Sequence, residues 1–288
     1  MKWPAGWKES GVSTATSMVR GIISNLPLLL LALVRKTTLS AHENMSTPAF
    51  IVVFFLCLVL GYRPTAAGDS RKSKRRIFCY GDSLTAGYVP STGEFFPYAK
   101  VLQEYLDIMH AHVEVDYKGL SGWRAEDLVK GDGTLQKMLE SGRRDAEPVD
   151  LVIILAGTND LGKADDEKIF KSVWKIHSIC HKENVATIAI SVPSSIIQKN
   201  SPSLAQTRAN LNNSIKSQCR LPSQCTYVEC PVVYTQETKE TLFSFDGLHF
   251  TKEGYSQLAK RLVPVVLRAL GMEKKSQLLP SLLSLPTY

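Results

Sequence analysis

The segment LVIILAGTND, residues 151–160, begins with five consecutive aliphatic residues and then becomes polar. A short apolar run without a polar face is typical of a strand that is covered on both sides, as in a parallel sheet flanked by helices. The polar residues after such a strand lie at its carboxyl end, where α/β proteins bind their ligands. Residues 151–155 therefore predict a central strand, and residues 156–160 a candidate site.

Apolar strands and amphipathic helices alternate on both sides of this segment. Four further strands are expected, at residues 77–80, 113–117, 186–192 and 226–233. Five helical regions are expected, at residues 96–109, 125–139 (broken at the glycines 131 and 133), 165–183, 203–217 and 252–270. This alternation predicts βαβ units and a mostly parallel sheet with helices on both faces. The expected fold class is α/β.

Three more polar segments are expected at the same edge of the sheet. GDSL (residues 81–84) follows the first strand, GLSG (119–122) follows the second, and DGLH (246–249) precedes the last helix. The carboxyl ends of parallel strands meet at one edge, so these segments and residues 156–160 are expected to lie close together.

The side chains of these segments suit nucleophilic catalysis. A serine hydroxyl needs a base within hydrogen-bond reach, and His249 stands in a short loop with Asp246 three residues earlier. This spacing lets one turn carry both residues, with Asp246 accepting from the imidazole and fixing its tautomer. Taken singly, each would be an ordinary loop residue. Together they predict Ser83 as nucleophile, His249 as base and Asp246 as its orienting acid.

Acyl transfer also needs hydrogen-bond donors for the oxyanion that forms on the substrate. The candidates are the backbone N–H groups of Ser83 and Gly122 and the side-chain amide of Asn159. Gly119 competes with Gly122, but Gly122 precedes a helix start, where backbone N–H groups are free.

The four segments together resemble the GDSL, or SGNH, hydrolase superfamily, named for Ser, Gly, Asn and His; here these are Ser83, Gly122, Asn159 and His249. The resemblance covers about residues 77–270. It implies a three-layer α/β/α sandwich with a flavodoxin-like, five-stranded sheet, and hydrolysis of a carboxylic ester through an acyl-enzyme. Its substrates would be short acyl esters, acylated sugars or lysolipids.

Two other functions fit the same residues. An acyltransferase would pass the acyl group to an alcohol or sugar through the same site. A catalytically silent binding module would keep the fold, although such a copy has no need to retain the full set of Ser83, Gly122, Asn159, Asp246 and His249. Phe95 and Trp123 are candidates for the wall of an acyl pocket, whereas Phe96 and Tyr98 are expected in the core.

The charge distribution argues against a nucleic-acid partner. The net charge is +7, but residues 1–76 hold 11 of the 34 basic residues and 3 of the 27 acidic ones. The rest of the chain has 23 basic and 24 acidic residues and so no basic excess for a polyanion. No phosphate-binding or dinucleotide motif is present, and no cofactor or metal is expected. His177 and His181 stand four apart on a helix, but a solvated helix face explains them better than a metal site.

The domain organisation is expected to be a leader at residues 1–76, the hydrolase domain at 77–270 and an irregular tail at 271–288. Residues 49–60 (AFIVVFFLCLVL) are too short to span a bilayer comfortably. They resemble a signal-peptide core, followed by Thr65-Ala66-Ala67 as a cleavage site. Secretory-pathway entry is expected, with Met45 as a possible true start and a mature chain from near Gly68. The alternative to cleavage is an uncleaved anchor. The basic run RKSKRR (71–76) is expected to be a solvated linker, with a processing site or a patch for anionic lipid headgroups at the bilayer surface as alternatives.

Two further features depend on this compartment. Cys219, Cys225 and Cys230 lie close together and are expected to form a local disulfide if the protein is secreted, with the pairing open. Asn212 begins an N-glycosylation sequon and is expected to carry a glycan if its helix exposes it.

Overall fold

A computed structural model describes residues 74–144, 148–220 and 224–276 of the chain. In this part of the chain, five strands form one parallel sheet in the order β4-β1-β5-β6-β7. They are β1 (Arg75–Gly81), β4 (Val113–Gly119), β5 (Val149–Leu155), β6 (Ala186–Ile190) and β7 (Cys225–Val228). The first strand thus lies between the second and the third, which is the flavodoxin-like order. The signal segment, its cleavage site, most of the leader and residues 277–288 lie outside the described residues.

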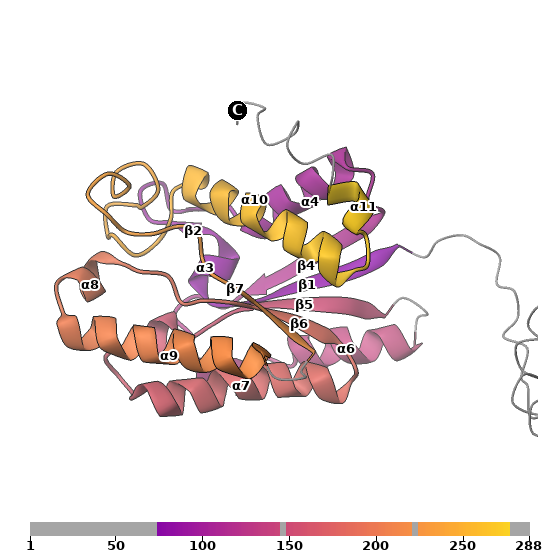
Figure 1. The fold of residues 1–288 in the computed structure, drawn as a ribbon, viewed down its shortest axis with the longest axis horizontal. Helices are drawn as coiled ribbons and strands as arrows, with labels where there is room; N and C mark the ends of the chain where they lie inside the picture. Colours follow the sequence, from indigo (N-terminus) through magenta and orange to yellow (C-terminus); the bar gives the residue numbers. More distant parts are fainter. Residues whose placement is uncertain (1–73, 145–147, 221–223, 277–288) are drawn as a thin grey trace, which may run out of the picture. The chain divides into compact units, whose positions relative to one another are not determined.

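Helices cover both faces of the sheet and make a three-layer sandwich (Figure 1). One layer contains α4 (Tyr98–Ile108), α10 (Lys252–Ala269) and α11 (Glu273–Ser276). The other contains α5 (Ala125–Lys130), α6 (Thr134–Arg144), α7 (Asp166–Lys182) and α9 (Pro202–Arg220). The α/β class and the five-stranded parallel sheet predicted from the sequence are confirmed.

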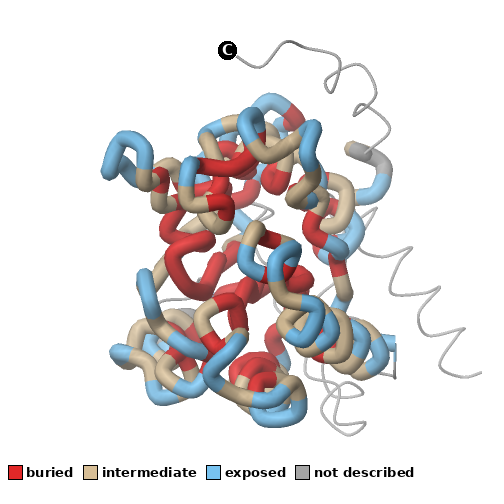
Figure 2. Tube along the Cα trace, turned by 90° about the vertical axis from the view of Figure 1, so that its left-hand side faces the viewer, coloured by how far each residue is buried: buried red, intermediate tan, exposed pale blue. Residues whose placement is uncertain are grey.

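The side chains of β1 show how the sheet joins the two layers. Ile77 and Cys79 belong to the apolar cluster that includes α4 and α10, whereas Phe78 and Tyr80 belong to the cluster that includes α7 and α9. Alternate residues of a strand point to opposite faces, so each face of β1 must be apolar. Figure 2 shows the resulting band of buried backbone through the middle of the molecule.

The first strand begins two residues before the expected boundary at Ile77, inside the basic run. Arg75 forms an ion pair with Asp150, and the Arg76 guanidinium lies 2.8 Å from Asp116. The Arg76 backbone N–H also donates to Asp150, at 2.8 Å. These paired charges allow basic residues to start a strand, so the prediction of a solvated linker up to residue 76 is wrong for Arg75 and Arg76. Residues 71–73 lie outside the described part.

The last strand ends at Val228, five residues before the expected end at Val233. Beyond this point the backbone bonds to side chains, since the Cys230 N–H donates to the Ser191 hydroxyl at 2.9 Å. Pro231 follows and has no N–H to donate to a sheet. These contacts end the regular pairing.

Among the described residues, five short elements were not predicted from the sequence. One of them, α11, follows α10 and makes residues 273–276 helical, so the prediction of an irregular tail is wrong there. The others follow strands of the sheet. They are α3 (Ser83–Ala86), the hairpin of β2 (Tyr88–Val89) and β3 (Glu94–Phe95), the 3₁₀ turn η1 (Thr158–Asp160) and α8 (Ile196–Lys199). Elements this short lack a periodic signal in the sequence.

Two predictions about modification have different outcomes. Cys219 and Cys225 form a disulfide that joins the end of α9 to the start of β7, and Cys230 is a buried free thiol. Asn212 is buried on α9, where its amide accepts from the Val192 N–H at 2.9 Å and donates to the Val192 carbonyl at 3.0 Å. The condition for a glycan, exposure of Asn212 by its helix, is therefore not met, and both polar atoms of the side chain are engaged.

Among the helices in residues 74–144, 148–220 and 224–276, none combines the length and the apolar character that crossing a bilayer requires.

Candidate active site

Ser83 lies at the tip of β1, as the first residue of α3. Asp82 caps this short helix, because its Oδ1 accepts from the Leu84 N–H at 2.9 Å. Gly87 closes the turn in the left-handed conformation, with φ of 77°, and its N–H donates to the Ser83 carbonyl. At Gly81 a side chain would not fit, since a Cβ there would lie 2.1 Å from the Leu155 carbonyl oxygen. The GDSL segment therefore folds into a tight turn that presents one serine.

The structure brings the three predicted catalytic residues together. His249 Nε2 lies 2.9 Å from Ser83 Oγ, and His249 Nδ1 lies 2.6 Å from Asp246 Oδ2. A neutral imidazole with its proton on Nδ1 donates to Asp246 and leaves Nε2 to accept from the Ser83 hydroxyl. The three side chains are thus connected by hydrogen bonds in the order Asp246, His249, Ser83.

The DGLH turn fixes Asp246 and His249 relative to each other. Asp246 Oδ1 accepts from the backbone N–H groups of Leu248 and His249, both at 3.0 Å. Partial burial raises the pKa of Asp246, but the bonds from the His249 ring and from these two N–H groups outweigh burial and hold its pKa below the ordinary value. Asp246 is therefore a carboxylate at neutral pH.

The three oxyanion-hole candidates lie on connected loops. The loop after β4 is joined to β1 by a bond from the Leu120 N–H to the Gly81 carbonyl, at 2.8 Å. The Asn159 amide donates to the Trp123 carbonyl at 2.9 Å, and within the part of the chain that the structure describes its second N–H has no acceptor. Among the described residues, the backbone N–H groups of Ser83 and Gly122 have no hydrogen-bond acceptor.

The two glycines of the GLSG segment have different surroundings. A Cβ at Gly119 would lie 2.0 Å from the backbone nitrogen of Ala86, so Gly119 is required where β4 packs against α3. Gly122 is exposed, has a φ of 81° and has open space around its Cα. These surroundings favour Gly122 as the donor that faces a ligand.

Two buried acids support this edge, although the sequence analysis did not single them out. Burial raises the pKa of Asp82 to about 7, against the opposing effect of its bond from the Leu84 N–H. Asp160, next to Asn159, accepts from the Ala125 N–H at 2.9 Å and so ties the turn after β5 to the start of α5. Asp82 belongs to the GDSL segment and Asp160 to the GTND segment. Their positions next to Ser83 and Asn159 were the signal in the sequence that could have identified them.

Tyr88 is a third residue that the sequence did not indicate. Its ring meets the His249 ring edge to face, with centroids 5.2 Å apart. The Tyr255 hydroxyl donates to the Tyr88 carbonyl at 2.9 Å, which holds β2 against α10. Of the aromatic residues considered earlier, Tyr98 is fully buried in the core and Phe95 is exposed.

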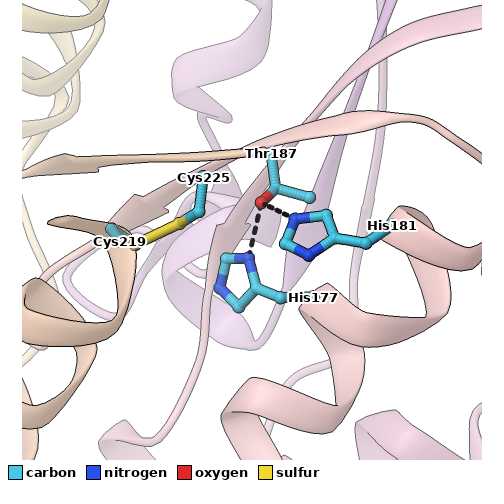
Figure 3. Close-up of a disulfide and its surroundings, with 5 residues drawn as sticks. All are labelled: His177, His181, Thr187, Cys219 and Cys225. Atoms are coloured by element: carbon cyan, nitrogen blue, oxygen red, sulfur yellow. Dashed lines mark hydrogen bonds between the residues drawn. A yellow bond between two sulfur atoms is a disulfide. The ribbon is translucent and has the colours of Figure 1, made fainter. Parts of the chain in front are cut away.

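His177 and His181 form a separate cluster at the other end of the sheet, near the disulfide (Figure 3). His177 Nδ1 and His181 Nε2 lie 2.8 Å and 2.9 Å from the Thr187 hydroxyl oxygen. Burial and, to a smaller extent, the nearby His181 lower the pKa of His177 to about 3. The prediction of a solvated helix face is therefore wrong for His177. No group of three or more metal-binding side chains occurs among the described residues.

A family model matches this site and its scaffold. Residues 79–257 match the GDSL-like Lipase/Acylhydrolase family. The chain belongs to this family. The predicted resemblance is thereby confirmed, and the protein is a hydrolase that acts on ester bonds. Among curated proteins, no match was found.

Solved structures of similar fold come from bacteria and a fungus. A carbohydrate acetylesterase family member from Sinorhizobium meliloti is 19% identical, with 68% of this chain and 99% of that chain covered and a TM-score of 0.53. A carbohydrate esterase family 3 protein from Talaromyces cellulolyticus is 16% identical, with coverage of 68% and 98% and a TM-score of 0.52. A lipase/acylhydrolase from Enterococcus faecalis is 20% identical, with coverage of 67% and 95% and a TM-score of 0.51. At these identities the comparison establishes a shared fold for this hydrolase.

Proposed function

We propose that the protein is a serine esterase that forms an acyl-enzyme on Ser83. The hydrogen-bonded series Asp246, His249, Ser83 carries this proposal, with distances of 2.6 Å and 2.9 Å. His249 Nε2 takes the Ser83 proton as Oγ attacks the ester carbonyl carbon. The protonated His249 then gives the proton to the leaving alcohol as the ester C–O bond breaks.

The second half of the reaction uses the same groups. His249 removes a proton from water, the resulting hydroxide attacks the acyl carbon, and Ser83 leaves with the proton that His249 returns. Asp246 keeps its negative charge and stabilises the imidazolium that forms in each half. The N–H groups of Ser83 and Gly122 and the Asn159 amide would bind the oxyanion of both tetrahedral intermediates.

A serine-directed probe tests this assignment directly. A fluorophosphonate should label the purified full-length protein on Ser83, as identified by peptide mass spectrometry, and should not label Ser83→Ala. Ser178→Ala, on α7 and away from the site, should label normally. Labelling of Ser83→Ala at the wild-type rate would refute Ser83 as the nucleophile.

The substrate class needs its own measurement. The similar folds include proteins described as carbohydrate esterases and as a lipase/acylhydrolase, so acylated sugars and lipid esters are both candidates. Rates on p-nitrophenyl esters of increasing chain length, on acetylated glycans and on lysolipids would rank them.

We also propose that this esterase enters the secretory pathway. The apolar run at residues 49–60 and the Cys219–Cys225 disulfide support this proposal, since disulfides persist in oxidising compartments. N-terminal sequencing of protein from its native source should find a chain that begins near Gly68. A chain that begins at Met1 or Met45 would contradict cleavage and favour an anchor.

A further inference from the structure

The exposed apolar side chains of the described residues are unevenly distributed. Six large hydrophobic residues are exposed: Phe95, Ile108, Tyr117, Ile197, Val233 and Phe245. Four of them, Phe95, Ile197, Val233 and Phe245, lie in the hairpin, the short helix and the loop that follow β1, β6 and β7. In Figure 1 these segments are on the left-hand side, beyond the carboxyl ends of the strands. We call these four residues the apolar rim.

Three members of the apolar rim are connected to the turn that carries Asp246 and His249. Phe245 is the residue directly before Asp246 and is 81% exposed. Ile197 follows Ile196, whose N–H donates to the Gly247 carbonyl at 2.9 Å. Val233 precedes Tyr234, whose ring lies 3.2 Å from the position of a Cβ on Gly247. The segments that carry these three exposed apolar residues therefore meet at the DGLH turn.

The fourth member reaches the same turn through aromatic contacts. Phe95 is 58% exposed, and its ring centroid is 5.4 Å from that of Tyr88. Tyr88 in turn contacts the His249 ring, with centroids 5.2 Å apart. The apolar rim thus approaches His249 from the hairpin as well as from α8 and the loop before α10.

The exposure of Phe245 indicates what the apolar rim contacts. A side chain that lines a pocket for one small ester is largely covered by its neighbours, whereas Phe245 projects from the surface next to the site. Clustered exposed apolar residues mark an interaction surface, and an apolar phase covers such side chains from outside.

The charged groups beside the rim are close to balanced. Lys252 forms an ion pair with Glu94 at 3.2 Å and lies over the Phe96 ring. Lys199 lies over the Tyr234 ring and interacts electrostatically with Glu237. Lysines with aromatic neighbours keep their ammonium groups in water while their stems cover apolar surface. The surface therefore suits a neutral or zwitterionic interface better than a strongly charged one.

We propose that the apolar rim docks the esterase onto the surface of a dispersed lipid ester, such as an emulsified triglyceride. The effect of docking on hydrolysis rests on the proposed esterase function. Docking itself does not require Ser83. Docking would bring the Ser83 hydroxyl to esters at the lipid surface while their apolar chains stay in the lipid phase.

Kinetics on one soluble and one dispersed ester test the consequence. The quantity to measure is a ratio of two hydrolysis rates. The numerator is the rate on tributyrin at concentrations above the solubility limit of tributyrin, and the denominator is the rate on dissolved p-nitrophenyl acetate. Phe245→Ser and Phe95→Ser should each lower this ratio about tenfold or more, because full burial of a Phe side chain corresponds to a factor of ten to a hundred. Ile108→Ser, an exposed residue at the end of α4, is the matched control and should leave the ratio unchanged.

Fluorescence tests docking without catalysis. Phe245→Trp in the Ser83→Ala background should shift its emission to the blue when zwitterionic micelles are added, whereas Ile108→Trp in that background should not. An unchanged rate ratio in both rim variants together with no blue shift would overturn the proposal. Emission that is already blue-shifted before micelles are added would also overturn it, since another part of the chain would then cover the rim.

The two measurements separate the two proposals. If the wild-type protein hydrolyses no ester but Phe245→Trp shifts, the esterase proposal fails and docking stands. If the protein hydrolyses dissolved esters but the rate ratio is insensitive to the apolar rim and Phe245→Trp shows no blue shift, the esterase proposal stands and docking fails.

Discussion

His249 and His177 each face a hydroxyl group, at 2.9 Å from Ser83 Oγ and 2.8 Å from Thr187 Oγ1, but at opposite ends of the sheet. His249 has Asp246 on its other nitrogen, whereas His177 is fully buried and its Nε2 has no hydrogen-bond partner among the described residues. A carboxylate stabilises an imidazolium, and burial without one opposes it. Contact with a hydroxyl therefore does not by itself make a histidine a base. Whether the ring can take a proton depends on the group that contacts its other nitrogen.

The two hydroxyl groups, of Thr187 and Ser83, differ as the two histidines do. The Thr187 hydroxyl lies between His177 and His181 and has one proton, so it donates to one ring and accepts from the other. This arrangement ties α7 to β6 and leaves no free nucleophile. Ser83, in contrast, stands at the tip of a strand, beside N–H groups that have no acceptor in the described chain.

The largest expected effect separates the two hydroxyl groups. Ser83→Ala should lower kcat/KM for a dissolved p-nitrophenyl ester by about 10⁴-fold or more, because the acyl-enzyme no longer forms. Thr187→Val removes the other hydroxyl and should leave kcat/KM within about threefold, because Thr187 lies at the opposite end of the sheet and has no contact with the reacting groups. Equal losses in both variants would mean that the contacts of Ser83 have no special role.

The next effect concerns the oxyanion donors, which belong to the site of His249 and not to the cluster of His177. Asn159→Ala should lower kcat by about 10²- to 10³-fold with little change in KM, since the amide is needed most when charge develops on the substrate oxygen. Steady-state kinetics on the same ester measure it. A rise in KM with unchanged kcat would instead assign Asn159 to substrate binding.

A third effect concerns stability and the buried histidine. Folding lowers the pKa of His177 from 6.5 to about 3, so between these values the unfolded chain binds the extra proton and stability falls as pH decreases. From pH 7 to pH 5 this histidine should cost about 2 kcal/mol. Urea unfolding at both pH values measures the loss. His177→Phe, which keeps a ring beside Trp174, should reduce the pH dependence by that amount, and an unchanged slope would contradict the assignment.

The smallest effect distinguishes the two glycines beside the site. Gly122→Ala has room for its methyl group but a φ of 81°, so it should lose about 1–2 kcal/mol of unfolding free energy. Gly119→Ala should lose more, because its Cβ would overlap the Ala86 backbone. Urea unfolding of both variants gives the comparison, and a greater loss for Gly122→Ala would reverse the inferred packing.

The sequence by itself determined the fold class and the five strands, and it predicted the members of the site. Apolar strands such as residues 151–155 carry a local signal, because a strand covered on both faces must be apolar along its whole length. The GDSL, GLSG, GTND and DGLH segments could be assigned to one edge because the carboxyl ends of parallel strands meet there. Ser83, Asn159, Asp246 and His249 were predicted in this way, and the structure places Ser83, His249 and Asp246 within hydrogen-bond reach of one another.

The tertiary structure decided the features that depend on partners distant in the chain. Arg75 and Arg76 start a strand because Asp150 and Asp116 lie beside them, and Asn212 is unavailable for a glycan because it bonds to Val192. Burial of His177 follows from the packing of α7 on β6, and the apolar rim exists because loops after three different strands converge on one turn. Such long-range pairings leave no periodic trace in the local sequence, so only the folded chain reveals them.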